Sequence, residues 1–581
     1  MKSSLRFVLL CIPFLVCAGV HVYSLDREAF SITKYDLDVR IEPQQHRLGA
    51  RGKITLQNDS PTPQKIAVLQ VSSALDWRSI KAGEKSLQFV SQDYASDIDH
   101  TGALSEVIVT LPQAIQPKST VDLEVAYEGV IVLDATRLTA IGIPESTARE
   151  TDWDQVSSNF TALRGVGYVT WYPIATEAAS LTEGSDLFEI VARWKAREAG
   201  AAMRLQITLP RDEGEPPELL VNATSCPVAH EVGQEFLADC TYRSLGSAVP
   251  TLVISNYEVI DRPSVSVHFM RGHDLAAVTY ADAAEKVAAF LAEWFGPARA
   301  KAETADLNDP NAAPFESGSL LLTPLSNSDP KLSGLVAAHQ LTHAAFFSSR
   351  PWINEGLAHF AQALYLEHQS GRQAALDYMK LHSSAFSAAK IENPGQAAAS
   401  KPGDDANRSL INTYDEGLYR SKAMCVWWML RDMIGDSALK KALASYHAAD
   451  DNEPSYMQRL IQAQTKQDLE WFFDDWIYRN RGLPEFKVAS AFARKTLPEG
   501  YMLAITIDNL GGAGAEVPLT VKFTGGEVTK RLVVRGKSSA TIRVEVPQPP
   551  QEVVVNGGSV PEKDPANNVF KIEADSAKPI P

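Results

Sequence analysis

The sequence predicts a multidomain α+β protein in which a helical middle region lies between two β-rich regions. Residues 26–258 contain short strand patterns separated by turn residues, and the alternation in Tyr35-Asp-Leu-Asp-Val-Arg-Ile is typical of a half-buried strand. From about residue 275 apolar residues recur at helical spacing, and from about residue 486 the chain returns to short strands. We therefore expect an N-terminal antiparallel β saddle or sandwich, a mainly helical domain and a C-terminal β-sandwich.

The size and charge of the chain limit the classes of function. Its 581 residues are enough for several domains, and the hydrophobic content of 45% is ordinary for globular protein. The net charge is −16 and there is no long basic run, which disfavours nucleic-acid binding. We divide the chain into residues 1–24, 25–258, 259–485 and 486–581.

The first 24 residues have the pattern of a secretory signal peptide. Lys2 and Arg6 form a positive segment, Phe7–Val20 is apolar, and Val22-Tyr23-Ser24 resembles a cleavage site. This predicts a secreted or periplasmic protein. The alternative is an uncleaved membrane anchor, since the apolar run is nearly long enough to span a bilayer. A membrane association is expected only in that case.

Export also bears on the cysteines. Removal of residues 1–24 would leave Cys226, Cys240 and Cys425. An oxidising compartment favours a disulfide between Cys226 and Cys240, and the alternative is two buried free thiols. Cys425 lies in an apolar run and is expected in the core.

Two histidines in the middle region have the spacing of metal ligands. Asp329-Pro330 predicts the start of a helix on which His339 and His343, at positions i and i+4, share one face. A helix break follows, and a second helix begins near Trp352-Ile-Asn-Glu355-Gly. This helix can place Glu355 opposite the histidines and complete three sides of a tetrahedral Zn²⁺ site. The alternative is a chance histidine pair and a first-turn acid stabilised by the helix dipole.

These residues carry a resemblance to a known family. His339-x-x-x-His343 followed by Trp-x-Asn-Glu355-Gly-x-Ala is similar to the gluzincin zinc metallopeptidases, especially the membrane alanyl aminopeptidase (aminopeptidase N) family. The resemblance covers about residues 30–480. It implies a thermolysin-like, mainly α catalytic domain over residues 259–485, a Zn²⁺ cofactor and a peptide or protein substrate. Supporting segments are Tyr35-Asp-Leu-Asp-Val-Arg-Ile, Val169-Thr-Trp-Tyr-Pro, the helix Leu275–Phe295 with the following Gly-Pro, and Lys422-Ala-Met-Cys-Val-Trp-Trp-Met-Leu-Arg.

The sequence departs from the family at the general base. Gln340 stands where the family has a catalytic glutamate, and an amide cannot accept the proton of a metal-bound water. The spacing between His343 and Glu355 is also shorter than in the family. We expect a shortened loop between the two helices to preserve the site.

Two further positions follow from the resemblance. The family binds the free amino group of its substrate through a glutamate on a strand, and the equivalent strand here contains Glu316, although its motif does not match in register. The family also uses a tyrosine to stabilise the tetrahedral intermediate. Alignment puts Arg420 at that position, so the adjacent Tyr419 is our candidate, with Tyr414 as the reserve and a packing role as the alternative.

Two functions are therefore open. The first is an exported zinc metallopeptidase that hydrolyses peptide bonds slowly, because general-base help is typically worth a factor of about 10²–10⁴ in rate. The second is a catalytically inactive pseudopeptidase that binds zinc and peptides or a protein partner. Gln340 nearly keeps the shape of glutamate and can still form hydrogen bonds, which fits binding without turnover.

Overall fold

The computed structural model covers the chain from residue 25 to residue 572, and a few stretches within it are not described. The predicted signal peptide (1–24) lies outside the described residues, as do residues 394–407, whose Gly, Ala, Ser and Asp content predicts a loop. The stretches left out between residues 25 and 572 are 97–103, 141, 166–169, 180–184, 212–215, 227, 234, 247–248, 299, 327, 389–408, 412, 414, 480 and 497–498.

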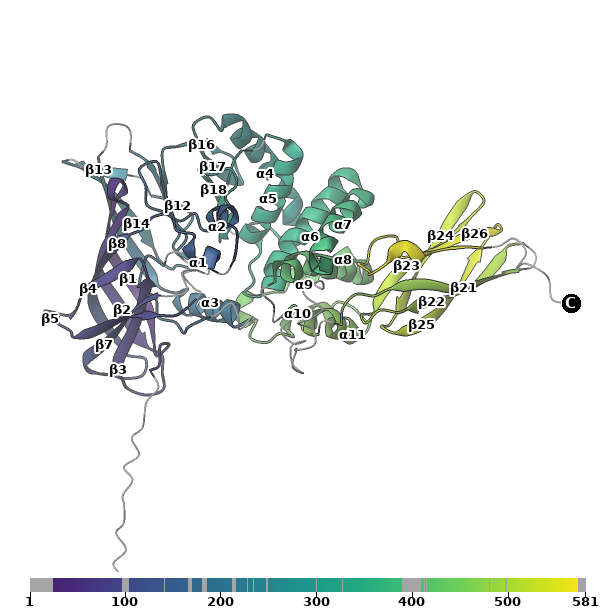
Figure 1. Ribbon diagram of the computed structural model, residues 1–581, viewed down its shortest axis with the longest axis horizontal. Coiled ribbons are helices and arrows are strands. Elements are labelled where there is room, and N and C mark those ends of the chain that lie inside the picture. Colours follow the sequence, from purple (N-terminus) through teal and green to yellow (C-terminus); the bar gives the residue numbers. More distant parts are fainter. Residues whose placement is uncertain are drawn as a thin grey trace, which may run out of the picture.

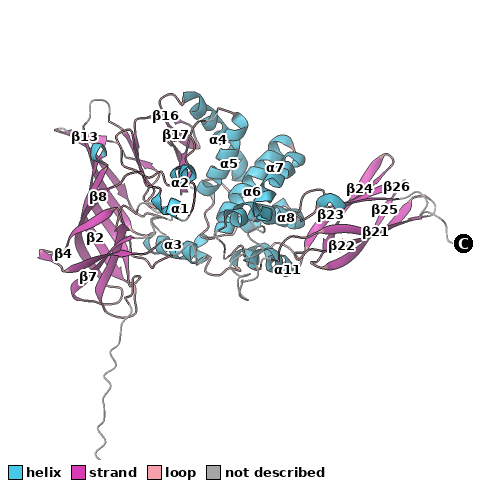
Figure 2. Ribbon diagram, viewed as in Figure 1, coloured by secondary structure: helices cyan, strands magenta, loops and turns pink. Residues whose placement is uncertain are grey.

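The predicted arrangement of two β regions around a helical region is confirmed (Figures 1 and 2). The N-terminal region is built on a sheet of eight strands in the order β13-β14-β10-β1-β2-β8-β4-β5, antiparallel except for the pair β1 and β10. Alternate residues of β1, such as Tyr35, Leu37 and Val39, are buried, as the sequence pattern predicts. The strands are β1 (Phe30–Glu42), β2 (Arg47–Asn58), β4 (Leu75–Ala82), β5 (Lys85–Ser86), β8 (Thr120–Val130), β10 (Ala202–Pro210), β13 (Val228–Val232) and β14 (Glu235–Tyr242).

Two smaller sheets complete the N-terminal region. One has the order β3-β7-β6 and the other β12-β11-β15-β9. Their strands are β3 (Gln64–Ser72), β6 (Phe89–Tyr94), β7 (Leu104–Ile115), β9 (Phe160–Leu163), β11 (Glu218–Val221), β12 (Thr224–Ser225) and β15 (Leu252–Ser255). The disulfide expected between Cys226 and Cys240 is present, with a Cα–Cα distance of 5.5 Å, and Cys425 is a buried free thiol.

The N-terminal region also contains helices, so the expectation of strands throughout residues 26–258 is incomplete. These are α1 (Thr136–Ala140), α2 (Glu145–Thr151) and α3 (Ser185–Glu198). Ile190, Trp194 and Glu198 of α3 are spaced four residues apart, and all three are buried on one face of the helix. This spacing is typical of a helix, although polar residues lie between the three. The Tyr35 hydroxyl donates a hydrogen bond of 2.7 Å to the Glu198 carboxylate and thereby ties α3 to β1.

The middle region combines a mixed sheet with the predicted helices. The sheet has the order β16-β17-β18-β20-β19, and β19 is an antiparallel edge strand. The predicted cap of α5 is present, because the Asp329 side chain accepts a hydrogen bond from the Lys331 backbone N–H. The strands are β16 (Tyr257–Asp261), β17 (Val265–Met270), β18 (Ala302–Asp306), β19 (Phe315–Ser317) and β20 (Leu320–Thr323). The helices are α4 (Asp274–Phe295), α5 (Pro330–Ala345), α6 (Pro351–Ser370), α7 (Arg372–Ala388), a π-helical segment (Gly417–Lys422), α8 (Ala423–Ile434), α9 (Asp436–Ala444), α10 (Tyr456–Gln462) and α11 (Glu470–Phe473).

Helix α6 packs closely against both α5 and α8. A Cβ atom on Gly334 of α5 would lie 2.9 Å from the Tyr365 ring of α6. A Cβ atom on Gly356 of α6 would lie 2.7 Å from the Ala423 Cβ and 3.0 Å from the Trp427 indole nitrogen of α8. Because both residues are glycines, the helices can pack closely, and any larger residue at either position would push them apart.

The C-terminal region forms the predicted β-sandwich. Its two sheets have the orders β21-β22-β25 and β24-β23-β26-β27. The strands are β21 (Phe486–Lys495), β22 (Tyr501–Asn509), β23 (Ala515–Phe523), β24 (Gly526–Val534), β25 (Ser538–Val546), β26 (Pro550–Val555) and β27 (Val569–Lys571). Among the residues that the structure describes, no helix has both the length and the apolar character needed to cross a membrane.

The contact between α3 and β1 makes the stability of the N-terminal region depend on pH. Burial raises the pKa of Glu198 from 4.5 to about 7, although the Tyr35 hydroxyl and other neighbours lower it. The folded state therefore keeps a proton that the unfolded chain loses above pH 4.5, and stability should fall by about 3 kcal/mol as pH rises from 4.5 to 7. Glu198→Gln should remove this fall while keeping an acceptor for Tyr35.

Urea unfolding of the wild type and the variant across this pH range measures the effect. Glu84→Gln, a change at an exposed position, is the control and should follow the wild type. Parallel curves for the wild type and Glu198→Gln would contradict the prediction.

Candidate metal centre

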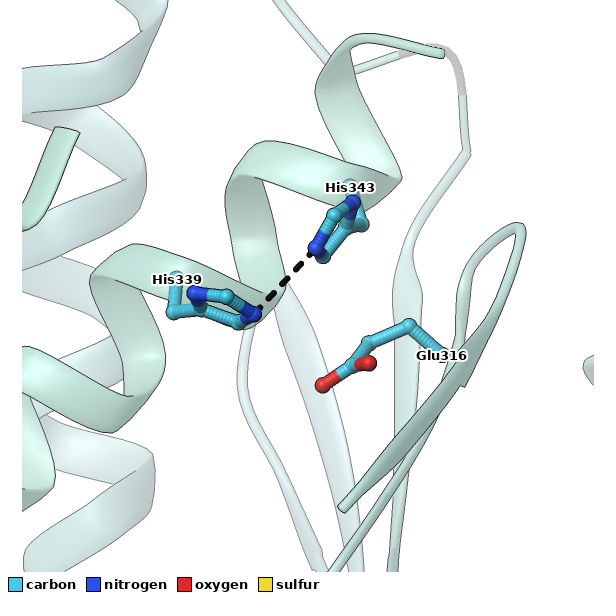
Figure 3. A group of neighbouring side chains, drawn as sticks. All are labelled: Glu316, His339 and His343. Atoms are coloured by element: carbon cyan, nitrogen blue, oxygen red, sulfur yellow. Dashed lines mark hydrogen bonds between the residues drawn. The ribbon is translucent and has the colours of Figure 1, made fainter. Parts of the chain in front are cut away.

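The two predicted histidines of α5 lie on one face and point at the same space (Figure 3). Their Nε2 atoms are 3.3 Å apart. The carboxylate of Glu316, on the edge strand β19, faces them, and ligand atoms of Glu316, His339 and His343 all lie within 4.8 Å of one another. This group could hold a metal ion.

Glu355, in the first turns of α6, closes a further side of the group. Its Oε1 lies 3.4 Å from the His343 Nε2 and its Oε2 lies 3.8 Å from the His339 Nε2. The neighbouring Asn354 side chain contacts the His343 Nδ1 at 3.0 Å and accepts a hydrogen bond from the Ser348 backbone N–H. This contact is made by the Asn354 amide nitrogen on the Nδ1 side of the imidazole, and the Nε2 lies on the side of the metal-binding group.

The distances fit zinc. Zinc bonds of about 2.0–2.2 Å to nitrogen and oxygen in a tetrahedron place neighbouring ligand atoms about 3.3–3.6 Å apart. The separations of 3.3 Å between the two Nε2 atoms and 3.4 Å between the His343 Nε2 and the Glu355 Oε1 match those values. The 3.8 Å separation involves the other oxygen of Glu355, Oε2. Imidazole nitrogen and carboxylate oxygen are also the ligand types that zinc accepts.

The surroundings favour the protonation states that bind a metal ion. Burial lowers the pKa of His339 well below its ordinary value, and His343 and Arg420 lower it further, so its imidazole is neutral. Burial alone would raise the pKa of Glu355, but His343 and Arg420 together hold it below its ordinary value. Glu355 is therefore a carboxylate.

Gln340 of α5 is buried, and a tyrosine of α4 forms a hydrogen bond with its side chain. The Tyr280 hydroxyl of α4 donates a hydrogen bond of 2.8 Å to the Gln340 Oε1, and the Thr304 hydroxyl donates to the Tyr280 oxygen at 3.4 Å. The Gln340 Nε2 has no hydrogen-bond partner of ordinary geometry in the described part of the chain. The Oε1 of Gln340 thus already accepts a hydrogen bond, and its Nε2 can only donate hydrogen bonds.

The π-helical segment brings Arg420 to the metal-binding group, and Tyr419 lies next to it in that segment. The Arg420 Nε donates to the Glu355 Oε2 at 3.1 Å, and its guanidinium also pairs with Glu416 at 3.0 Å. The Tyr419 hydroxyl donates to Glu416 at 3.4 Å, and burial raises the pKa of that phenol. Tyr414 lies outside the described residues.

Other neighbours had weaker signals in the sequence. His359 follows Glu355 by one helical turn, and its ring centroid lies 4.9 Å from that of His339. Tyr280 and Arg420 come from segments remote in sequence, and no local pattern marks their contacts with Gln340 and Glu355. Gln362 of α6 donates a hydrogen bond of 3.0 Å to the Leu335 carbonyl of α5.

The family comparison matches the region that contains this centre. Residues 325–476 match the model of the peptidase family M1 domain. The part of the chain that holds the metal-binding group is similar to the peptidase family M1 domain. The resemblance to the gluzincin peptidases is thereby confirmed, and the match supports a peptidase function for the M1 domain.

Solved structures of M1 zinc metallopeptidases have the same fold. One from Deinococcus radiodurans is 17% identical, with a TM-score of 0.51 over 79% of this chain and 95% of its own. A mutant of that enzyme with a bound Tyr-Ser-Ala substrate is 17% identical, with a TM-score of 0.52 over 80% of this chain and 97% of its own. A search of curated protein sequences found no match. The M1 relatives imply Zn²⁺ as the cofactor, and the His and Glu group described above could bind it.

The hydrogen bond from Tyr280 makes a prediction about stability. Tyr280→Phe would leave the Gln340 carbonyl buried without its donor, which should lower the free energy of unfolding by about 1–3 kcal/mol. Urea unfolding measures this loss. Tyr378→Phe is a matched control, because it removes a bond of the same kind, to Gln362, at a part-buried position. Its loss should be smaller, and equal losses would show that the Gln340 carbonyl is not specially dependent on Tyr280.

Proposed function

We propose that the chain is an exported, zinc-binding metallopeptidase-like protein that binds peptides at its metal centre and has lost most of the hydrolytic turnover. The observation that carries the proposal is the state of Gln340. It occupies the position of the general base, yet its oxygen accepts from Tyr280 and its nitrogen can only donate.

In this proposal His339, His343 and Glu355 hold the ion. When bound, zinc polarises a peptide carbonyl and lowers the pKa of a coordinated water. Arg420 keeps one oxygen of Glu355 hydrogen-bonded, so the other remains for the metal. Asn354 keeps the His343 ring in orientation.

The step that Gln340 cannot perform is removal of a proton from the metal-bound water. General-base help is typically worth about 10²–10⁴ in rate, so a site with Gln340 keeps its affinity for peptides and loses most of its turnover. The Tyr-Ser-Ala substrate bound by the Deinococcus radiodurans mutant supports a peptide as the ligand of this centre. The signal-peptide pattern of residues 1–24 supports a secreted or periplasmic location.

A slow zinc metallopeptidase is the second candidate, and Glu316 favours it. This carboxylate faces the same space as the two histidines. A carboxylate at this position could accept a proton from water in place of the absent glutamate at position 340.

The test is a comparison of the mature chain with Gln340→Glu. We expect about one zinc per chain in both, peptide binding in both, and hydrolysis that rises by about 10²–10⁴ with the substitution. Zinc is measured by elemental analysis, binding by calorimetry, and cleavage by mass spectrometry of blocked and unblocked peptides.

Gln369→Glu, at an exposed position of α6, adds the same charge away from the centre and should change nothing. Chains without zinc would refute both candidates. Hydrolysis by the unaltered chain that Gln340→Glu does not increase would refute the first candidate and support the second.

A further inference from the structure

Glu316 is placed at the metal centre by a rigid piece of backbone. Strand β19 pairs with β20, and Glu316 lies opposite Leu321 in that register. The next residue, Ser317, accepts a hydrogen bond from the Val249 backbone N–H and donates one to the Val249 carbonyl, both at 3.2 Å. Gly318 then turns the chain with a φ of 62°, a conformation that favours glycine. The Glu316 side chain therefore starts from a fixed point and extends toward His339 and His343 (Figure 3).

The hydrogen bonding of the Glu316 carboxylate is incomplete in the described part of the chain. Its Oε1 is buried and has no hydrogen-bond partner in the part of the chain that the structure describes. A buried carboxylate without a partner is costly, and it is normally paired or bound to a metal ion. Gln340 offers this carboxylate an amide without a charge, and Arg420 pairs with Glu355 and Glu416, so a bound cation would balance the charge of Glu316.

We propose that Glu316 is a fourth protein ligand of the zinc ion and closes the centre when no peptide is bound. The inference rests on the proposed function, because it requires zinc at His339, His343 and Glu355. Four protein ligands are typical of closed zinc sites, whereas catalytic sites have three and leave a position for water. A peptide must then displace Glu316 to reach the ion.

Gln340 fits this arrangement better than a glutamate would. Its side chain lies beside the Glu316 carboxylate and can donate a hydrogen bond to it. The two charges of zinc are balanced by the carboxylates of Glu316 and Glu355. A third carboxylate at position 340 would add a like charge in the same buried space. The loss of the general base and the use of Glu316 as a ligand are therefore linked.

The experiment uses the mature chain with zinc, and cobalt(II) as a coloured substitute, in Glu316→Gln and Glu316→Ala. Zinc affinity is measured by competition with a chelator. Loss of a ligand should weaken it by at least about tenfold, because even partners outside the coordination sphere cost 10–100-fold. Azide, which replaces a water on an open metal site, is titrated into the cobalt protein and followed by visible absorption.

We expect azide to leave the spectrum of the wild type unchanged and to alter the spectra of both variants. Glu258→Gln, on the exposed edge strand β16, is the matched control and should behave as the wild type in both measurements. Circular dichroism establishes that each variant is folded, and Glu316→Gln keeps the size of the side chain if Glu316→Ala does not fold.

Three outcomes separate the possibilities. If azide alters the spectrum of the wild type as it does the variants, or if zinc affinity does not change, Glu316 is not a ligand and the inference is overturned while the proposed function stands. If the wild type binds no zinc, both fail. If Glu316→Gln leaves zinc affinity unchanged and lowers only the affinity for peptides with a free amino group, Glu316 instead binds the substrate, which also overturns the inference.

Discussion

The close packing of α6 between α5 and α8 is the constraint on which the metal centre depends. The two histidines share one helix and would lie together in any fold that keeps α5 helical. Glu355 reaches them because Gly334 lets α6 approach α5. Gly356, one residue after Glu355, lets α6 approach α8, and the π-helical segment before α8 then presents Arg420 to Glu355. A wider helix spacing would separate both contacts, so the small residues matter as much as the ligands themselves.

Burial of many ionisable groups in one place sets the electrostatics of the centre. A neutral imidazole at His339 avoids the cost of a buried positive charge, and the fall in the pKa of His339 reflects this. Glu355 remains charged because His343 and Arg420 compensate for its loss of water. Arg420 also pairs with Glu416, so two carboxylates form ion pairs with its guanidinium. A bound cation of charge two would balance the carboxylates of Glu316 and Glu355.

The parts of the site that could be predicted are those that depend on neighbours in sequence. The cap at Asp329, the spacing of His339 and His343 and the return at Asn354-Glu355 all follow from local helical rules. Helix α3 was missed because its polar residues interrupt a region dominated by strand alternation. The contacts of Tyr280 with Gln340 and of Arg420 with Glu355 join residues sixty or more positions apart, and only tertiary packing creates them.

Gln340 is more than the loss of a carboxylate, because its neighbours are arranged for an amide. Tyr280 donates to its oxygen, and its nitrogen is on the side of Glu316, so the two ends of the side chain face a donor and an acceptor. A glutamate has no donor to offer Glu316 and would repel it. The residue at 340 and the carboxylate at 316 therefore have to be considered as a pair. A fold that keeps its zinc ligands but has the amide of Gln340 in place of a catalytic glutamate can bind the metal ion without catalysing peptide hydrolysis.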